Sequence, residues 1–311
     1  MAETPDISII TVNFNGIADT RELLKSIDNC ILDLSYEVIV VDNGSENDEA
    51  NALSTEYMHH KILRSDKNLG FSGGNNLGIN ASSGKFIFLL NNDALLVDNS
   101  IIELVKVLES DSSAGAVSPK IYYQDSAKII QFAGFTEFSK LTVRNSIIGS
   151  NELDYGQYDT LAETASAHGA AMMVKREVVE KAGLMPEIYF LYYEEHDWCA
   201  NMKRLGYKIF FQPSATIVHK ESRSTGIRSY IKSYYISRNR ILFAFRNSKG
   251  LIKYVSLVYL ILIANTKDFL KFFFTGRRDL SVAVFKGVRD FFKLKNKFEK
   301  HFQNERCLKY H

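Results

Sequence analysis

Short apolar runs alternate with segments of helical spacing through the first hundred residues, and this alternation constrains the fold more than any other feature. Residues 7–12 and 37–41 are apolar and rich in β-branched side chains, as expected for buried strands. Between them, residues 19–31 carry Leu23 and Ile27 on one helical face. Strands separated by helices predict βαβ units and a largely parallel sheet. Further strands are expected at 61–64, 86–90, 114–118 and 169–174, and further helices at 47–57, 100–109, 177–182 and 195–205.

Polar residues directly follow each of the first four expected strands. In parallel sheets, ligands bind beyond the carboxyl ends of the strands, so these residues are candidates for a binding site. Any one of the segments could be an ordinary turn, because Asn, Asp and Gly are the usual turn residues. Four in succession favour a functional site over turns alone. The polar segments are residues 13–16, 42–45, 68–76 and 91–93.

Charge divides the chain into two regions. Residues 228–311 contain 19 Lys and Arg against 5 Asp and Glu, whereas the rest of the chain contains 19 against 31. The same C-terminal stretch holds 17 of the 37 Phe and Tyr residues. An acidic body and a basic, aromatic tail indicate two regions with different roles. We expect an α/β body at 1–227, with halves of about 1–110 and 111–227, and a mainly helical tail at 228–311.

Cysteine usage and the first residues indicate a compartment. Cys30, Cys199 and Cys307 are odd in number, far apart and in no metal-binding pattern, which favours a reducing compartment. Residues 1–6 contain two acidic side chains and no basic stretch before an apolar run, so we expect no signal peptide. These features predict a cytoplasmic protein, or one on a membrane that faces the cytoplasm.

Five motifs in order resemble those of family 2 glycosyltransferases, which have the GT-A fold. The resemblance is closest to the bacterial rhamnosyltransferase-like branch and covers roughly residues 7–246. It implies that 1–227 is a GT-A catalytic domain: a Rossmann-like, mostly parallel sheet with helices on both faces, a nucleotide-binding half and an acceptor half. No dinucleotide-type GxGxxG is present, because the glycines within 70–78 have the wrong spacing. The motifs are Thr11-Val12-Asn13-Phe14-Asn15, Val41-Asp42-Asn43-Gly44-Ser45, Asn68-Leu69-Gly70-Phe71, Asn91-Asn92-Asp93 and Tyr193-Glu194-Glu195-His196-Asp197-Trp198.

The resemblance implies a divalent metal, Mg²⁺ or Mn²⁺. Transfer from a nucleotide sugar releases a diphosphate, and a metal bridging both phosphates offsets the charge that grows on the leaving oxygen. The family's Asp-x-Asp-like element is matched by residues 91–93, in which only Asp93 is a carboxylate, so Asp93 is the implied ligand. His219 is a second candidate ligand, because imidazole binds Mn²⁺. The alternatives are a turn cap at Asp93 and a hydrogen-bonded edge residue at His219.

The other strand ends are implied to bind the nucleotide sugar. Asp42 matches the family residue that accepts a hydrogen bond from a pyrimidine base; an Asx turn is the structural alternative, and the two are compatible. Gly70 would allow close approach of the backbone to the ligand. The departure at Asn91 from the family pattern suggests contact with the sugar or ribose. The implied nucleotide-sugar-binding set is Asn13, Asn15, Asp42, Asn68, Gly70, Asn75, Asn91 and Asn92.

An acidic cluster at the start of the helix expected at 195–205 is the candidate catalytic site. Transfer with inversion needs a base that takes the acceptor hydroxyl's proton as the hydroxyl attacks the anomeric carbon. The family places this base at the second residue of an acidic pair before a helix, which is Glu195 here. Asp197 is the second candidate base, and Glu194 shares a helical face with it. A purely structural alternative is a negatively charged helix start.

The basic tail matches the family least. Residues 254–266 are uncharged and mostly apolar, but they fall short of the ~20 residues needed to span a bilayer. Lys and Arg mixed with Phe, Tyr and Leu are typical of an interfacial amphipathic helix, and anionic lipid attracts such basic residues. We expect peripheral binding to an anionic membrane at the inner face of the cell membrane, where lipid-linked acceptors reside. The alternative is a helical lid with a solvated basic face.

Together these features predict an inverting, metal-dependent glycosyltransferase of cell-surface polysaccharide synthesis. The family branch favours dTDP-L-rhamnose as the donor, with a UDP-sugar as second choice, and a glycan or lipid-linked acceptor. A catalytically inactive sugar-nucleotide-binding module is the main alternative, because Asn91 and Glu195 depart from the commonest pattern. Nucleic acid is not an expected partner, because an acidic pocket would repel phosphates without a metal; its members are Asp42, Asp93, Glu194 and Glu195.

Overall fold

The computed structural model describes residues 4–30, 34–124, 126, 128–220 and 229–308. Contacts divide the chain into two compact units. Unit 1 is Met1–Glu137 with Asn145–Glu221, and unit 2 is Phe138–Arg144 with Ser222–His311. The segment Phe138–Arg144 therefore interrupts unit 1 in the sequence but belongs to unit 2 by its contacts.

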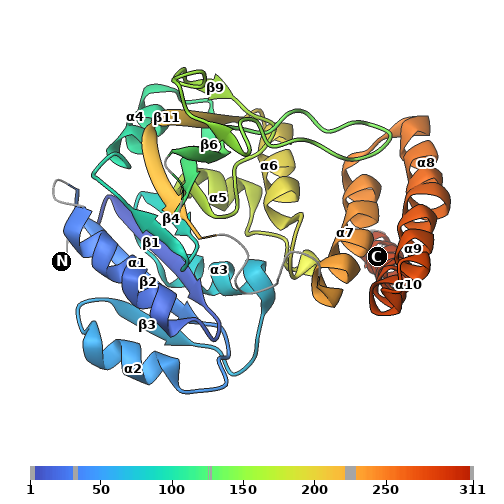
Figure 1. Ribbon diagram of the computed structural model, residues 1–311, viewed down its shortest axis with the longest axis horizontal. Coiled ribbons are helices and arrows are strands. Elements are labelled where there is room, and N and C mark those ends of the chain that lie inside the picture. The colour runs from blue at the N-terminus through green and yellow to red at the C-terminus, as the bar shows by residue number, and fades with distance from the viewer. Residues whose placement is uncertain (1–3, 31–33, 125, 127, 221–228, 309–311) are drawn as a thin grey trace. The chain divides into compact units, whose positions relative to one another are not determined.

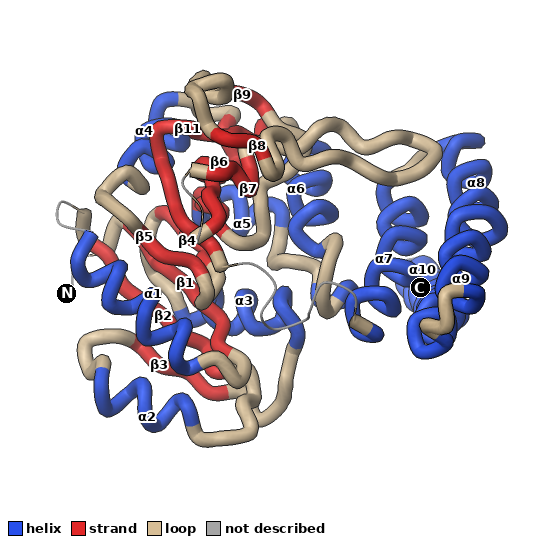
Figure 2. The backbone as a smooth tube through the Cα atoms, in the orientation of Figure 1, coloured by secondary structure: helices blue, strands red, loops and turns tan. Residues whose placement is uncertain are grey.

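Unit 1 is built on one mixed sheet, drawn in red in Figure 2. Four strands on one side are parallel and lie in the order β3-β2-β1-β4 (Figure 1), namely β1 (Ile7–Asn13), β2 (Tyr36–Asp42), β3 (Lys61–Arg64) and β4 (Phe86–Leu90). The sheet continues from β4 through β10 (Ala171–Lys175), β6 (Ala114–Tyr123), β11 (Lys208–His219) and β5 (Ala94–Leu96). β6 and β11 are parallel, whereas β10 runs antiparallel to both of its neighbours and β5 antiparallel to β11.

The α/β class predicted from the sequence is confirmed, and β3 and β4 have the predicted bounds. β10 departs from the parallel arrangement because the described residues between β6 and β10 form no helix that could return the chain across the sheet. They form instead the short strands β7 (Ile129–Phe132), β8 (Glu152–Leu153) and β9 (Ala162–Glu163). Most of this connection is the stretch 122–159, whose sequence shows no clear period.

Helices cover both faces of the sheet and bury a separate apolar cluster on each. The first cluster includes Leu23 of α1 and the second Trp198 of α6. Neighbouring residues of β1 enter different clusters, Ile9 the first and Ile10 the second, because successive side chains of a strand point to opposite faces. The helices of the first face are α1 (Ile17–Cys30), α2 (Glu49–Glu56) and α4 (Ile102–Ser110), and those of the second are α3 (Gly70–Ala81), α5 (Arg176–Ala182) and α6 (Glu194–Arg204).

Helix α3 is unusual because its sequence is rich in Gly and Asn, which are poor helix formers. The sequence identifies this segment as a motif but does not predict a helix. Packing on the sheet accounts for it: a Cβ added at Gly78 would lie 2.3 Å from Cγ2 of Ile10 on β1. Close helix–sheet approach therefore requires glycine there, and tertiary contact overrides the low intrinsic propensity.

Unit 2 is helical. The loop Phe138–Arg144 is fixed within it, since Arg240 Nε donates to the carbonyl of Thr142 at 2.8 Å and Ser256 Oγ to that of Leu141 at 2.9 Å. The helices are α7 (Tyr230–Asn247), α8 (Gly250–Val258), the π-helical η2 (Tyr259–Ala264), α9 (Asn265–Phe274) and α10 (Arg278–Leu308).

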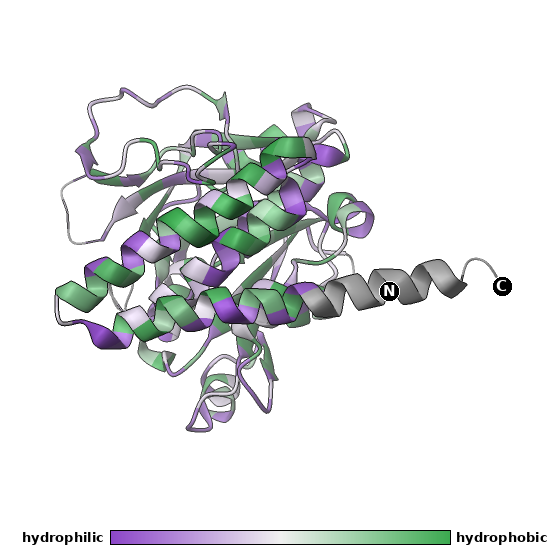
Figure 3. Cartoon of the chain, turned by 90° about the vertical axis from the view of Figure 1, so that its right-hand side faces the viewer, coloured by the Kyte–Doolittle hydropathy of each residue, from purple (hydrophilic) through white to green (hydrophobic). Residues whose placement is uncertain are grey.

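One side of the α8–α9 segment leaves apolar side chains in solvent. Leu251, Val255, Val258 and Leu262 are exposed and recur every three or four residues, which places them along one helical face. Figure 3 shows green, apolar stretches along the helices of this unit. Within the described residues, the helices are all too short or too polar to cross a membrane.

Candidate active site

The polar residues that follow β1 and β4 meet at the carboxyl edge of the parallel strands. Thr20 Oγ1 donates to Asn13 Oδ1 at 2.8 Å, and Asn92 Nδ2 donates to the same hydroxyl at 3.1 Å. Asn13 Nδ2 also faces Asp42 Oδ1, at 3.3 Å, across the β1–β2 pair. Asn43 Nδ2 in turn donates to Asn68 Oδ1 at 3.2 Å, so all four polar segments singled out in the sequence are joined by hydrogen bonds.

A buried carboxylate, Glu49, organises this edge. Its Oε2 accepts hydrogen bonds from Asn13 Nδ2 at 2.7 Å, from the backbone N–H of Gly16 at 3.2 Å and from Ser45 Oγ at 3.4 Å. Both polar atoms of the Asn13 side chain are therefore engaged within the protein, so Asn13 positions the two loops. The sequence places Glu49 only within a polar helix, and nothing in that pattern distinguishes it from its exposed neighbours.

Asp42 is fully buried, and one of its two carboxylate oxygens accepts no hydrogen bond from the described residues. Oδ1 accepts from the backbone N–H of Ser45, three residues on, at 3.3 Å, so the side chain holds the turn after β2 by a longer loop than an Asx turn. Oδ2 has no hydrogen-bond partner among the described residues, and the nearest cationic atom, Nε of Arg64, lies 4.0 Å away. A buried acceptor without a donor is costly, so this oxygen is suited to an N–H group brought by a ligand.

Three further residues of the predicted nucleotide-sugar set lie in loops or within α3. Asn15 is exposed, has a φ of 51°, and accepts a hydrogen bond from the N–H of Glu46 at 2.9 Å. Asn68 Oδ1 accepts from the N–H of Gly70 at 2.8 Å and so caps the turn into α3. Asn75 is buried within α3 and donates to the carbonyl of Phe71 at 2.9 Å.

Gly70 allows a close contact, but within the protein. Its φ is 76°, and a Cβ at this position would lie 2.3 Å from the carbonyl oxygen of Phe190, which accepts from the N–H of Phe71 at 2.7 Å. Phe190, Tyr192 and Tyr193 all have positive φ, in the region that non-glycine residues rarely adopt. Such outliers cluster at functional sites, and here they immediately precede α6 and its acidic first turn.

Asp93 and His219, 126 residues apart, are brought together by the pairing of β5 with β11. Asp93 Oδ1 lies 3.0 Å from His219 Nε2, and Asn91 Nδ2 lies 3.4 Å from the same nitrogen. Burial favours the neutral acid at Asp93, but the hydrogen bond and charge of His219 outweigh it, so the pKa of Asp93 is lowered. Asp93 is therefore a carboxylate at neutral pH.

The other side of the His219 ring defines what this pair can bind. Gln131 Oε1 lies 2.8 Å from His219 Nδ1, and an amide oxygen only accepts, so Nδ1 carries a proton. Nε2 faces the Asp93 oxygen at 3.0 Å, a distance at which an imidazole nitrogen and a carboxylate oxygen share either a proton or a cation. One imidazole nitrogen and one carboxylate oxygen, both turned to the same point, are a donor set that fits a divalent metal. Gln131 lies in the stretch without a clear period, and the sequence gives no signal for it.

Of the two candidate bases, Glu195 and Asp197, only Glu195 is accessible to solvent. Its side chain is 17% exposed, while Asp197 is almost fully buried. His196 Nε2 lies 3.8 Å from Oε1, and within the described part of the chain no donor is hydrogen-bonded to this carboxylate. Gly169 lies beside it, so a Cβ there would be 3.7 Å from Glu195 Oε1. An uncommitted carboxylate at a helix N-terminus beside a glycine can accept a proton from a hydroxyl.

Neutral histidines and aromatic rings lie behind this carboxylate. Burial lowers the pKa of His196, whose Nδ1 lies 2.5 Å from Ser166 Oγ and whose ring meets Phe135 edge-on at 5.0 Å. Burial, followed by the charges of His219 and His196, lowers the pKa of His168 to about 3. His168 is stacked with Phe135, with ring centroids 5.9 Å apart. These rings supply an apolar wall rather than further charge.

The amino-acid sequence is similar to those of known proteins. The model of the family described as Glycosyl transferase family 2 matches residues 8–183. The chain is 28% identical over 267 residues to the low-salt glycan biosynthesis hexosyltransferase Agl10 of Haloferax volcanii, which is 82% of each protein. It is 24% identical over 257 residues to the dTDP-rhamnosyl transferase RfbF of Shigella flexneri, covering 78% of this chain and 83% of that protein.

A solved structure with a similar fold is the mannosyltransferase PcManGT from Pyrobaculum calidifontis, in complex with GDP-Man and Mn²⁺. The TM-score is 0.57 at 16% sequence identity, and the similarity covers 91% of this chain and 74% of that one. At this level of identity the likeness concerns the fold, which agrees with the sheet order and the helices on both of its faces.

Proposed function

The chain belongs to glycosyl transferase family 2 and has the GT-A fold, and on that premise we propose that it is an inverting, metal-dependent sugar transferase. The proposed reaction moves a sugar from a nucleoside-diphosphate sugar to a hydroxyl of a glycan or lipid-linked acceptor in cell-surface polysaccharide synthesis. The observation that carries it is the pair formed by Asp93 Oδ1 and His219 Nε2, two potential metal-ligand atoms 3.0 Å apart at the carboxyl edge of the sheet.

Each step of the proposed reaction has a side chain suited to it. The free Oδ2 of Asp42 would accept the N3–H of a pyrimidine base, which fixes the nucleotide at the end of β2. Mg²⁺ or Mn²⁺ held by Asp93 and His219 would offset the charge on the leaving diphosphate. Glu195 would take the proton of the acceptor hydroxyl as that oxygen attacks the anomeric carbon from the side opposite the diphosphate. Asp197, which is buried, would hold the first turn of α6.

For the donor we propose dTDP-L-rhamnose, with a UDP-sugar as the alternative. The similarity to a protein named as a dTDP-rhamnosyl transferase, over 78% of this chain, supports the first. The greater identity is to a protein named only as a hexosyltransferase, without a donor, so UDP-sugars are included in the panel. Both bases present the same N3–H to Asp42, so that contact does not distinguish them.

We also propose that unit 2 binds the surface of an anionic membrane, peripherally and at the inner face of the cell membrane. The exposed apolar row of α8 and η2 supports this, as does the excess of Lys and Arg in residues 228–311. A pocket of about 240 Å³ in the same unit adds a place for a phosphate group, since Asp268 is the single acid among its charged lining residues. The basic residues that line it are Arg144, Arg240, Lys267 and Lys271.

Release of nucleoside diphosphate from a panel of nucleotide sugars tests the reaction. The reactions contain Mn²⁺, Mg²⁺ or a chelator, with a membrane lipid extract as acceptor. Metal-dependent release from one donor, lost in Asp93→Ala, would support the proposal and identify the donor. Nucleotide binding without release from any donor, in the presence of acceptor extract, would favour an inactive binding module. Absence of nucleotide binding would contradict the proposal.

A further inference from the structure

A second group of metal-binding side chains lies at the opposite edge of the sheet. Asp28 is in the last turns of α1, and His59 and His60 directly precede β3. α1 starts beyond the carboxyl end of β1 and runs back along the sheet, so these residues gather at the amino-terminal edge of the parallel strands. The pair Asp93–His219 follows the carboxyl ends.

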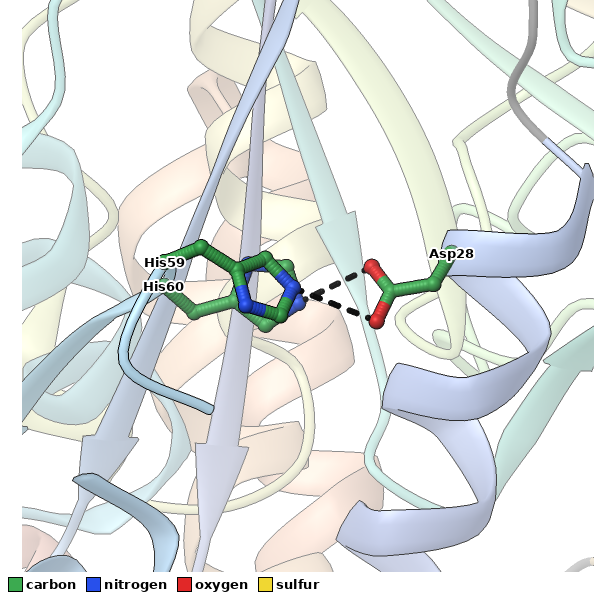
Figure 4. A group of neighbouring side chains, drawn as sticks. All are labelled: Asp28, His59 and His60. Carbon is green, nitrogen blue, oxygen red and sulfur yellow. Dashed lines mark hydrogen bonds and ion pairs between the residues drawn. The ribbon is translucent and has the colours of Figure 1, made fainter. Parts of the chain in front are cut away.

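The three side chains converge in a ligand-like geometry. His59 Nε2 lies 3.3 Å from Asp28 Oδ2, and His60 Nε2 lies 3.2 Å from Asp28 Oδ1. The three ligand atoms all lie within 4.8 Å of one another. Figure 4 shows both rings with their nitrogen edges turned toward the carboxylate. Two ligands at about 2.0–2.1 Å from a tetrahedral zinc ion are themselves about 3.3 Å apart, close to the separations found here.

An independent observation that favours a metal site is the buried, unpartnered ring nitrogen of His60. Its side chain is 3% exposed, and Nε2 has no hydrogen-bond partner among the described residues, because the short approach to Asp28 lacks hydrogen-bond geometry. The ring stacks on Tyr57 with centroids 5.9 Å apart, which fixes the direction of Nε2.

We propose that Asp28, His59 and His60 bind a zinc-like transition-metal ion, separately from the cation of the proposed transferase reaction. Two imidazoles and one carboxylate are a donor set for Zn²⁺, whereas Mg²⁺ prefers oxygen ligands. His59 is 62% exposed, so the ion has a path from solvent and a fourth position open to water. The bound ion would link the end of α1 to the start of the short edge strand β3.

Calorimetric titration with Zn²⁺ tests this site. The protein, with any affinity tag removed, is first dialysed against a chelator and then titrated in saturating Mg²⁺. All proteins carry Asp93→Asn, so that zinc at the other pair is not counted. We expect about one ion per chain, with affinity at least ~10-fold weaker in Asp28→Asn and in His59→Ala. If both variants bound Zn²⁺ as tightly as the parent, or if the parent bound none, the proposal would be overturned.

A second measurement separates loss of ligands from loss of folding. Co²⁺ in a tetrahedral nitrogen–oxygen site gives visible absorption bands, which we expect in the parent and not in His59→Ala. In chelator the melting temperatures of the two proteins should agree, because His59 is largely exposed. Saturating zinc should raise the parent's melting temperature by on the order of 5 °C and the variant's by less. Equal shifts in parent and variant would place the ion elsewhere and contradict the site.

Discussion

The two units differ in which side chains depart from the rule that apolar residues are buried and polar residues exposed. Unit 1 buries polar side chains, among them Asp42 and Glu49, at the edge of an otherwise apolar sheet. Unit 2 instead leaves large apolar side chains in solvent, with Leu251 and Phe274 each 79% exposed. A buried polar group and an exposed apolar row both raise the free energy of the isolated protein unless another molecule completes them.

Under the proposed functions, the difference corresponds to two kinds of ligand. At the edge of unit 1 the unmet requirement is for particular atoms, such as a donor for Asp42 Oδ2 or a cation between Asp93 and His219. In unit 2 the unmet requirement is for area, which a lipid surface supplies without specific partners. Each of the following substitutions should therefore affect one unit and spare the other.

The largest effect should come from Glu195→Gln. Glutamine keeps the size of the side chain but removes the base, so kcat should fall about 10³-fold while vesicle binding stays unchanged. Turnover of the preferred donor and liposome flotation measure the two properties. Glu46→Gln, an exposed acid on the same side of the sheet, serves as control and should keep full turnover. If Glu195→Gln stays active and Asp197→Asn does not, the base is Asp197.

The converse test is the double substitution Leu251→Ser with Phe274→Ser. Removing two exposed apolar side chains should weaken partition onto anionic liposomes about 100-fold. Turnover with a short water-soluble acceptor should stay at the parent level. Met58→Ser is the matched control, since Met58 is 86% exposed but belongs to unit 1. Equal loss of binding in the control, or no binding by the parent at low salt, would remove the membrane role.

A third test asks what a fully partnered buried acid contributes to unit 1. Burial of Asp154 is outweighed by hydrogen bonds from Tyr122 and Lys120, so its pKa is lowered to about 2. A lowered pKa stabilises the fold above the ordinary value near 4, and the gain is lost as pH falls from about 4 to about 2. Asp154→Asn should therefore lower the free energy of unfolding by about 2 kcal/mol at neutral pH.

Urea unfolding of the parent and of Asp154→Asn measures this contribution. The difference between the two should shrink as the pH approaches about 2. A constant difference at every pH would mean that the substitution acts through packing instead of charge.

The smallest effect is expected at Asp42→Asn. The new amide keeps an oxygen for Asn13 and Ser45 but presents N–H toward the base, so the Kd for a pyrimidine nucleotide should rise about 10-fold. Calorimetric titration with dTDP or UDP measures it. Stability should not fall, because the substitution removes a buried charge that lacks a full partner. Asp66→Asn, at an exposed acid, is the control. Unchanged affinity in Asp42→Asn would contradict the contact with the base.

Periodicity and local residue types predicted the α/β class and several strand and helix bounds of unit 1. The strands at 61–64 and 86–90 are one example, because short buried runs bounded by polar residues are locally determined. Helix α3 was not predicted, since its glycines are favourable only against β1. The strand at 169–174 was predicted, but the antiparallel direction of β10 was not, because strand direction depends on the connection that precedes it.

The candidate site divides in the same way. Resemblance to the family singled out Asp93 and His219, which the structure brings together, while their roles remain proposals. Glu49 and Gln131 could not be found from the sequence, because they act on other side chains of the site and carry no motif of their own. Phe138–Arg144 likewise gives no compositional signal that it packs with the helices of unit 2.

The composition of α3 has a consequence for how the protein folds. A segment with Gly at four of its twelve positions has little tendency to form a helix by itself, so it gains order only after β1 and β2 have paired. Gly70 and Asn68, at its start, hold the segment that precedes Glu195 through Phe190. During synthesis, therefore, this part of the chain should acquire its native form late. A partly folded chain would have a sheet before it has a place for the donor.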